Sequence, residues 1–292
     1  MSKIEKRQLR LTQQQSIEAA KRAREKAARR AEKAMARQQQ IEAQAPDMGD
    51  GIERTGPVDC ACLIHSNGYT WDYVEKLYNM LSRNISRGIR FHVYTEHDRS
   101  VPPHMIKHNL ETIDPLWHGP RKSWWYKIQL FNQQHHAGPL LYFDLDTVVV
   151  NRLDWIPLLN LRYMWAPKDY RSLWRPTHLG INSSVMWFDT RRFAHVWDDF
   201  KLKDFGLIRR TFHGDQDYIS DAINPNVIRH FLPNNVMSYR WQVHDGGIDF
   251  RTRLPLAPGA GTLVDYRTSV LVFHGSPKPH ETDDPVIKNF WQ

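Results

Sequence analysis

Cysteine is scarce in this sequence. The 292 residues contain two cysteines, Cys60 and Cys62, one residue apart, which excludes a disulfide scaffold and a zinc site of four thiolates. No run approaches the roughly 20 apolar residues that a membrane-spanning helix needs. The polar N-terminus also lacks the apolar segment of a secretory signal. We therefore expect a protein of a reducing compartment and predict a cytoplasmic location.

The first 46 residues lack aromatic side chains, and residues 8–45 lack glycine and proline. Strong helix formers dominate this segment, so we predict a basic helical arm over residues 1–46. Its apolar stripe is mostly alanine, which buries little area. A solvated helix, a coiled-coil or other oligomerising helix, and a tether to an acidic surface therefore remain alternatives. Residues 47–57 are rich in turn formers and predict a linker, with the folded domain at residues 58–292.

The positive charge of the chain is concentrated in this arm. Residues 1–46 hold 12 Lys and Arg against 5 Asp and Glu, a balance of +7 out of the total of +8. The remaining residues are almost neutral. The folded domain therefore carries no electrostatic signal for nucleic-acid binding.

In the folded domain, short apolar segments alternate with longer amphipathic ones. Short apolar runs predict strands, and apolar side chains three to four residues apart predict helices. Alternating strands and helices predict an α/β fold with a mostly parallel sheet covered on both faces. We expect strands at residues 58–65, 90–95, 140–143, 147–150, 184–188, 227–232 and 269–273, and helices at residues 71–83, 123–132 and 215–223.

Two carboxylates, Asp144 and Asp146, follow the strand predicted at residues 140–143. Side chains two residues apart on an extended segment point to the same side, so these carboxylates repel each other unless a cation neutralises them. Carboxylate oxygens suit Mg²⁺ or Mn²⁺. The pattern predicts a divalent metal site at this edge of the sheet, and a pair of turn-forming aspartates is the alternative.

A second polar segment follows the last predicted strand and reads H-G-S-P-K-P-H over residues 274–280. His274 can ligate a metal, and Lys278 can contact phosphate oxygens. Gly275 permits close approach of the backbone to a ligand. These residues predict an anion- or metal-binding loop, and a proline-rich surface loop is the alternative.

Four further polar residues lie in or beside predicted elements. Lys127 lies on the helix at residues 123–132, Asn182 precedes a strand, and Asp215 and Gln216 open a helix. Amides and carboxylates in such places can bind sugar hydroxyls. Alternatively, Asn182, Asp215 and Gln216 form caps or turns, and Lys127 is an ordinary surface lysine.

Taken in chain order, four segments resemble the glycosyltransferases of the GT-A fold. These are D-L-D at residues 144–146, N-S-S-V-M at residues 182–186, D-Q-D at residues 215–217 and H-G-S-P-K-P at residues 274–279. Within that group they are most similar to glycosyltransferase family 8 and related compact bacterial and phage-type sequences. The resemblance spans residues 58–281 and excludes the arm. It implies a Rossmann-like sheet flanked by helices, and a catalytic domain at residues 58–292.

The resemblance also implies roles for individual residues. Asp144, Asp146 and His274 would hold Mn²⁺ or Mg²⁺ against the diphosphate of a nucleotide-sugar donor, and Lys278 and Lys127 would contact that donor. In family 8 the histidine lies three residues before the glycine, where this chain has Val272. His274 adjoins the glycine instead, and His280 offers a second imidazole.

The remaining implied roles concern the two ends of the donor. Tyr69 would stack on a uracil base, and Gly275 would lie against the donor. Asn182, Asp215 and Gln216 would line the sugar and the reaction centre, with Asp146, Asp215 and Gln216 as the catalytic set.

The implied reaction is metal-dependent hexosyl transfer from a nucleotide-diphosphate sugar, with a UDP-sugar as the expected donor and retention as the expected outcome. The acceptor would be a glycan, a protein or a lipid-linked molecule. A non-catalytic module that binds nucleotide sugars is one alternative. A phosphatase is another, because F-D-L-D-T at residues 143–147 also resembles the nucleophile motif of the haloacid-dehalogenase type.

Overall fold

The computed structural model describes residues 55–66, 68–113, 123–173, 175, 177–232, 234–243 and 267–292. The predicted arm at residues 1–46 lies outside the described residues, so the arm and the domain boundaries stay predictions. None of the helices in the described part of the chain is both long and apolar enough to cross a membrane.

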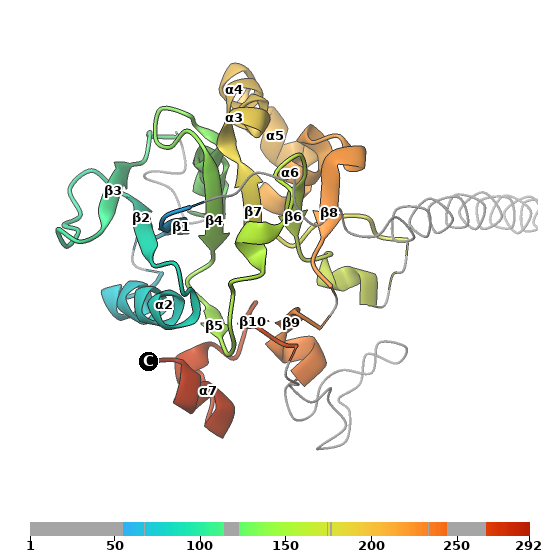
Figure 1. The fold of residues 1–292 in the computed structure, drawn as a ribbon. Helices are drawn as coiled ribbons and strands as arrows, with labels where there is room; N and C mark the ends of the chain where they lie inside the picture. The colour runs from blue at the N-terminus through green and yellow to red at the C-terminus, as the bar shows by residue number, and fades with distance from the viewer. Residues whose placement is uncertain are drawn as a thin grey trace, which may run out of the picture. The chain divides into compact units, whose positions relative to one another are not determined.

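The main sheet has seven strands in the order β3-β2-β1-β4-β7-β6-β8 (Figure 1). Strands β3, β2, β1 and β4 are parallel to one another, β7 runs antiparallel to both β4 and β6, and β8 is parallel to β6. The prediction of a mostly parallel sheet is therefore confirmed. The strands are β1 Val58–Leu63, β2 Ile89–Thr95, β3 Ile106–Asn109, β4 Pro139–Phe143, β6 Met164–Ala166, β7 Val185–Asp189 and β8 Ile228–His230.

A separate sheet of three strands has the order β5-β10-β9. Its strands are β5 Thr147–Val149, β9 Val236–Ser238 and β10 Val270–Val272. The sequence predicted extended segments at residues 147–150 and 269–273 but placed them in a single sheet, which is wrong. Strand β5 instead turns away from the main sheet directly after β4 and pairs antiparallel with β10. This pairing brings the segments after β4 and β10 together.

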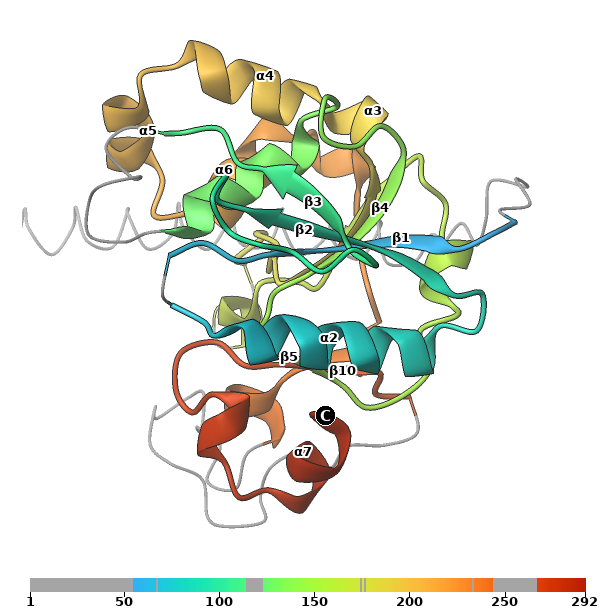
Figure 2. The ribbon, with the colours of Figure 1, turned by 90° about the vertical axis from the view of Figure 1, so that its left-hand side faces the viewer.

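Helices cover both faces of the main sheet, as the α/β pattern predicted. Figure 2 shows α2 and α7 on one side of strands β1 to β4, and α3 to α6 on the other. The helix predicted at residues 123–132 is present as the 3₁₀ helix η1 Ser123–Phe131. The α-helices are α2 Trp71–Asn84, α3 Thr190–Phe193, α4 His195–Leu202, α5 Phe205–Thr211, α6 Asp215–Ala222 and α7 Pro285–Phe290. The further 3₁₀ helices are η2 Ile156–Leu158, η3 Tyr170–Leu173, η4 Pro225–Val227 and η6 Pro279–Glu281. Segment η5 Tyr239–Val243 is a π-helix.

Alternating side chains of the central strands build two cores, one on each face of the main sheet. In β4, Leu141 and Phe143 face the core on the α2 side, whereas Leu140 and Tyr142 face the core on the η1 side. Strand β7 divides its side chains in the same way. Because both faces are covered, these strands read as continuous apolar runs in the sequence. The runs therefore identified the strands but could not reveal their directions.

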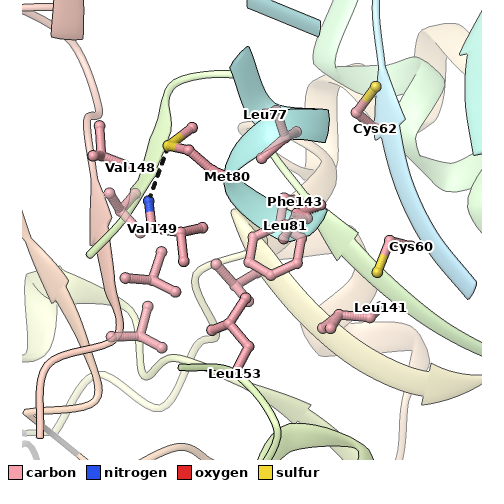
Figure 3. Packing of buried hydrophobic residues seen from close by; sticks show 14 of the residues in the cluster. Cys60, Cys62, Leu77, Met80, Leu81, Leu141, Phe143, Val148, Val149 and Leu153 are labelled. Atoms are coloured by element: carbon pink, nitrogen blue, oxygen red, sulfur yellow. Dashed lines mark hydrogen bonds between the residues drawn. The ribbon is translucent and has the colours of Figure 1, made fainter. Parts of the chain in front are cut away.

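Helix α2 joins the main sheet to the small sheet. Its buried face consists of Tyr73, Val74, Leu77, Met80 and Leu81. The Met80 sulfur accepts a hydrogen bond from the Val149 backbone N–H in β5 at 3.3 Å (Figure 3). This contact ties the turn after β4 to the helix.

Replacement of Leu77 by alanine is expected to destabilise the fold by about 3 kcal/mol, because the side chain is fully buried and its loss leaves a cavity. Leu202→Ala is the matched control, since Leu202 is 87% exposed, and its effect should stay within about 0.5 kcal/mol. Urea unfolding of both variants measures the difference. Equal midpoints for the two variants would contradict the assignment of α2 to the core.

Candidate functional site

The D-L-D segment lies between β4 and β5 and is fixed on both sides by backbone hydrogen bonds. The Asp144 N–H donates to the Ser184 carbonyl at 2.8 Å, next to the start of β7. The Phe273 N–H donates to the Asp146 carbonyl at 2.9 Å, at the end of β10. The segment that the sequence singled out is therefore held at the carboxyl end of a central parallel strand, where α/β proteins bind their ligands.

Lys127 reaches this segment from η1. Its Nζ lies 2.9 Å from Asp144 Oδ1 and 3.3 Å from Asp215 Oδ2, at the start of α6. It also donates to the Ser183 hydroxyl at 3.0 Å, and that hydroxyl donates to Asp215 Oδ2 at 2.7 Å. Lys127 is therefore not a surface lysine but the centre of a network that connects η1, β4 and α6.

The charge of Lys127 is set by opposing effects. Burial acts to lower the pKa of this amine, but the carboxylates of Asp144 and Asp215 outweigh it and raise the pKa above the usual value. Lys127 is therefore a fixed positive charge at neutral pH. Tyr142 also donates its hydroxyl to Asp144 Oδ1 at 2.7 Å. Asp144 Oδ1 therefore forms an ion pair with Lys127 and accepts a hydrogen bond from the Tyr142 hydroxyl.

Lys278 holds the other carboxylate of the D-L-D segment. Its Nζ lies 2.5 Å from Asp146 Oδ2 and donates to the Tyr69 hydroxyl at 3.0 Å. Tyr69, from the turn after β1, donates in turn to Asp146 Oδ2 at 2.8 Å. Three segments that are far apart in the sequence therefore meet at Asp146, and they follow strands β1, β4 and β10.

The two carboxylates of the segment act on each other. Burial raises the pKa of Asp146, and the negative charge of Asp144 raises it further, against the lowering effects of Lys278 and Tyr69. Each carboxylate already has a lysine beside it, yet the mutual repulsion remains. A hard divalent cation beside both carboxylates would offset this repulsion.

His274 lies at the end of β10, but it does not form a tight group with these carboxylates. Its Nε2 lies 2.6 Å from the Ser238 hydroxyl, and its ring contacts Tyr170 and Trp241. Asp144, Asp146 and His274 do not bring three ligand atoms within 4.8 Å of one another. Burial first, and then nearby Arg240 and Lys278, lower the pKa of His274 to about 4, so the imidazole is neutral at neutral pH.

Gly275 adopts a φ of +77°, a conformation that favours glycine. A Cβ atom at this position would lie 2.8 Å from Arg240 Nη1. The sequence predicted close backbone approach to a ligand here. What the structure shows is a turn that brings the chain from β10 toward Lys278. His280, the second imidazole, contacts Tyr73 and Trp291 instead of the carboxylates.

Gln216 and Asn182 adjoin the network in the sequence, because Gln216 follows Asp215 and Asn182 precedes Ser183. Gln216 Nε2 donates to Asp169 Oδ2 at 3.1 Å. Asn182 Oδ1 accepts from the Ser184 N–H at 3.1 Å, which is the turn contact given above as the alternative. Sequence reasoning missed Asp169 and Ser183 as parts of this network. Asp169 follows the three-residue strand β6, and a carboxylate after a strand would have been a signal if that strand had been recognised.

We compared the chain with protein-family models, curated protein sequences and solved structures, and only solved structures match it. No protein-family model and no curated protein sequence matches the chain. The galactosyltransferase LgtC, solved with donor and acceptor sugar analogs, matches with a TM-score of 0.52 at 12% identity, over 80% of this chain and 96% of LgtC. The glycosyltransferase GlyE of Streptococcus pneumoniae TIGR4 matches with a TM-score of 0.53 at 12% identity, over 77% of this chain and 56% of GlyE. This chain has the GT-A fold.

The arrangement of the two sheets brings the residues of the network together. The D-L-D segment occupies the carboxyl end of β4, and the small sheet brings the loop that carries Lys278 to the same place. At 12% identity the likeness shows the fold alone, so membership of glycosyltransferase family 8 stays a prediction.

Proposed function

We propose that the chain transfers a sugar, a hexose with retention of configuration, from a nucleotide-diphosphate sugar to a glycan, protein or lipid-linked acceptor. The donor we propose is a UDP-sugar. One observation carries this proposal: Lys127 and Lys278, from distant segments, converge on the two carboxylates of the D-L-D segment in a GT-A fold. Positive and negative groups are thus concentrated where a charged ligand would bind.

Cleavage of the bond between the sugar and the diphosphate leaves negative charge on the phosphate oxygens, and the transition state has oxocarbenium character. Fixed cations near that charge lower the barrier because they need no reorganisation during the reaction. Lys278 and Lys127 are held in place by Asp146 and Asp144, so they are preorganised for this role. Tyr69 lies beside Lys278, where we place the uracil end of the donor.

The same residues fit a divalent cation, because Asp144 and Asp146 repel each other even beside two lysines. We propose that these two carboxylates hold Mn²⁺ or Mg²⁺, with the neutral imidazole of His274 as the further ligand. A bound divalent ion would supply additional positive charge to the leaving diphosphate.

Asp215 lies in the same network and connects the donor side to α6. We place Asp215, Gln216 and Asn182 against the donor sugar, with Asp215 and Gln216 nearest the reaction centre. Gly275 would bring the backbone of its loop against the diphosphate. These placements rest on the proposed reaction and on the contacts of Lys127 described above.

A panel of nucleotide sugars tests the proposal directly. A donor that binds the folded protein raises its melting temperature, and we expect the largest rise with a UDP-sugar together with Mn²⁺. Release of UDP in the presence of that donor would then demonstrate transfer or hydrolysis. Binding without release would favour the non-catalytic module, release of phosphate from para-nitrophenyl phosphate would favour the phosphatase, and no binding of any nucleotide sugar would contradict the proposal.

Replacement of Lys278 by methionine is expected to lower kcat/KM for the donor by about 10- to 100-fold, the effect of losing a hydrogen bond to a charged group. Lys288→Met is the matched control, because Lys288 is largely exposed and pairs with the fully exposed Asp283. Steady-state kinetics with varied donor measures both. Equal kcat/KM values for the two variants would remove Lys278 from the donor site.

A further inference from the structure

A second cluster of ionisable side chains involves strands β1 and β2 and the segment before β4, and it includes no residue of the D-L-D segment. Asp59 is the second residue of β1, His92 lies in β2, and His136 precedes β4. In the part of the chain that the structure describes, they are the one group of three His, Cys, Asp or Glu side chains with ligand atoms within 4.8 Å of one another. Asp144, in contrast, follows the carboxyl end of β4. The two sites are therefore separate.

Strand register brings this cluster together. Strands β1, β2 and β4 are neighbours in the main sheet (Figures 1 and 2). Asp59 lies opposite Arg90 in the β1–β2 pair, and His92 lies opposite Ala61, two residues further along β1. Asp59 and His92 project to the same face as Tyr94, because residues two apart in a strand share a face.

The hydrogen bonds of the two histidines leave ring nitrogens available for a cation. His136 Nε2 lies 3.0 Å from the Pro139 carbonyl, which can only accept, so Nε2 carries a proton and Nδ1 has a lone pair. His92 Nδ1 lies 2.8 Å from His108 Nε2, and His92 Nε2 lies 2.9 Å from Asp59 Oδ1. A proton on Nδ1, donated to His108, leaves the Nε2 lone pair directed toward Asp59.

Two further side chains lie beside the cluster: Arg90 contacts Asp59, and His135 packs against His108. Arg90 contacts both oxygens of Asp59, but its side chain is 56% exposed and a carboxylate has about four lone-pair positions, so one oxygen can serve a metal. On the other side, the buried Nε2 of His135 makes no hydrogen bond among the described residues. Its ring lies against Tyr94 and His108. This corner of the sheet therefore holds more imidazole nitrogen than its hydrogen bonds use.

We propose that Asp59, His92 and His136 bind one zinc ion in a site separate from the D-L-D segment. Two imidazole nitrogens and one carboxylate oxygen suit zinc, whereas Mg²⁺ and Mn²⁺ prefer oxygen ligands. His108 and the Pro139 carbonyl are the outer partners that fix the ring orientations of His92 and His136. The ion lies between the Nε2 lone pair of His92 and an oxygen of Asp59, and His92 keeps the proton that its Nδ1 donates to His108, so no proton has to leave. It links β1, β2 and the segment before β4.

Calorimetric titration with zinc tests the site in the full-length, metal-stripped protein, with excess Mg²⁺ present to occupy oxygen-rich sites. We expect one zinc per chain in the wild type and a rise in melting temperature on binding. His136→Asn should weaken zinc binding by more than roughly 100-fold, because loss of an outer partner alone costs about 10- to 100-fold. His104→Asn is the matched control, since His104 is exposed and packs on Tyr78.

The Asp146→Asn variant distinguishes zinc binding at the histidine cluster from zinc binding at the D-L-D segment. We expect this variant to bind zinc as the wild type does. Zinc binding that is lost in Asp146→Asn but kept in His136→Asn would assign the ion to the D-L-D segment and overturn the proposal, as would a wild type that binds no zinc. Circular dichroism of the metal-free variants checks their folding, and Asp59→Asn is the second variant if His136→Asn unfolds. Anomalous scattering from a zinc-soaked wild-type crystal locates the ion without any substitution, and density elsewhere would contradict the site.

Discussion

Replacement of Asp146 by asparagine is expected to lower the rate of glycosyl transfer by about 10²- to 10³-fold, the usual effect of removing one preorganised electrostatic group. Asparagine keeps the size of the side chain but removes the charge that holds Lys278 and that would hold the metal. The Tyr69 hydroxyl retains an oxygen to which it can donate. The substitution should therefore change the chemistry more than the fold. Turnover at saturating donor and Mn²⁺, with the melting temperature, measures both.

Asp283→Asn is the matched control for this substitution, because Asp283 is fully exposed and lies outside the network. It should leave the rate unchanged. Near-parental turnover of purified Asp146→Asn at saturating donor and metal would contradict the role of Asp146. A loss of activity accompanied by a collapse of the melting temperature would instead assign Asp146 to the fold, which its contacts with Tyr69 and Lys278 also support.

The sequence predicted the parts of the site that follow strands. Buried strands are apolar runs, so the carboxylates of Asp144 and Asp146 after one run and Lys278 after another stand out. The contact of Lys278 with Asp146 arises instead from the antiparallel pairing of β5 with β10 in the small sheet, which the expected single sheet did not contain. The resemblance implied a donor contact for Lys127 but not its pairing with Asp144 and Asp215, and in the sequence a lysine within aromatic residues could equally lie on the surface.

The parts that the sequence did not predict depend on topology. Hydrophobic pattern does not encode strand direction, so the reversal of β7 could not be read from it. Strands β6 and β9 have three residues each, too few for a period to show. Missing β6 also meant missing Asp169. In η1 most side chains are buried on all sides, so no amphipathic face could distinguish a 3₁₀ helix from an α-helix.

The histidine cluster shows the same limit more clearly. Asp59, His92 and His136 are spread over 78 positions and have none of the short spacings that mark a metal site in sequence. Their meeting requires the β1–β2 register and the position of β4 beside β1. A one-residue slip of β2 would turn His92 to the other face. The register of two strands cannot be predicted from a local sequence pattern, because it depends on residues far apart in the chain.

Replacement of Lys127 by methionine is expected to destabilise the fold by about 3–5 kcal/mol, because it leaves buried carboxylates without their cation. A domain of ordinary stability would remain folded at 25 °C after such a loss. Lys76→Met is the control, since Lys76 forms an i,i+4 pair with the largely exposed Asp72, and it should cost at most about 0.5 kcal/mol. Denaturant unfolding measures both variants.

A second substitution, made in the Lys127→Met protein, identifies which buried carboxylate causes the loss of folding stability. The Asp215 side chain is 7% exposed and that of Asp144 is 24% exposed, so Asp144 regains water more easily when the lysine is gone. Asp215→Asn should therefore restore more stability to the Lys127→Met protein than Asp144→Asn does. A larger recovery with Asp144→Asn would show that the repulsion between Asp144 and Asp146, and not the burial of Asp215, dominates the network.

The pH dependence of the Lys127→Met variant provides an independent check. Burial already raises the pKa of Asp215 in the intact protein, and removal of Lys127 removes a charge that opposes this rise. The folded state then binds a proton that the unfolded state has released, so stability falls as pH rises above about 4 and levels off above the raised pKa. The wild type should show a weaker dependence. Parallel stability curves for the two proteins between acid and neutral pH would mean that Asp215 does not depend on Lys127 for its charge.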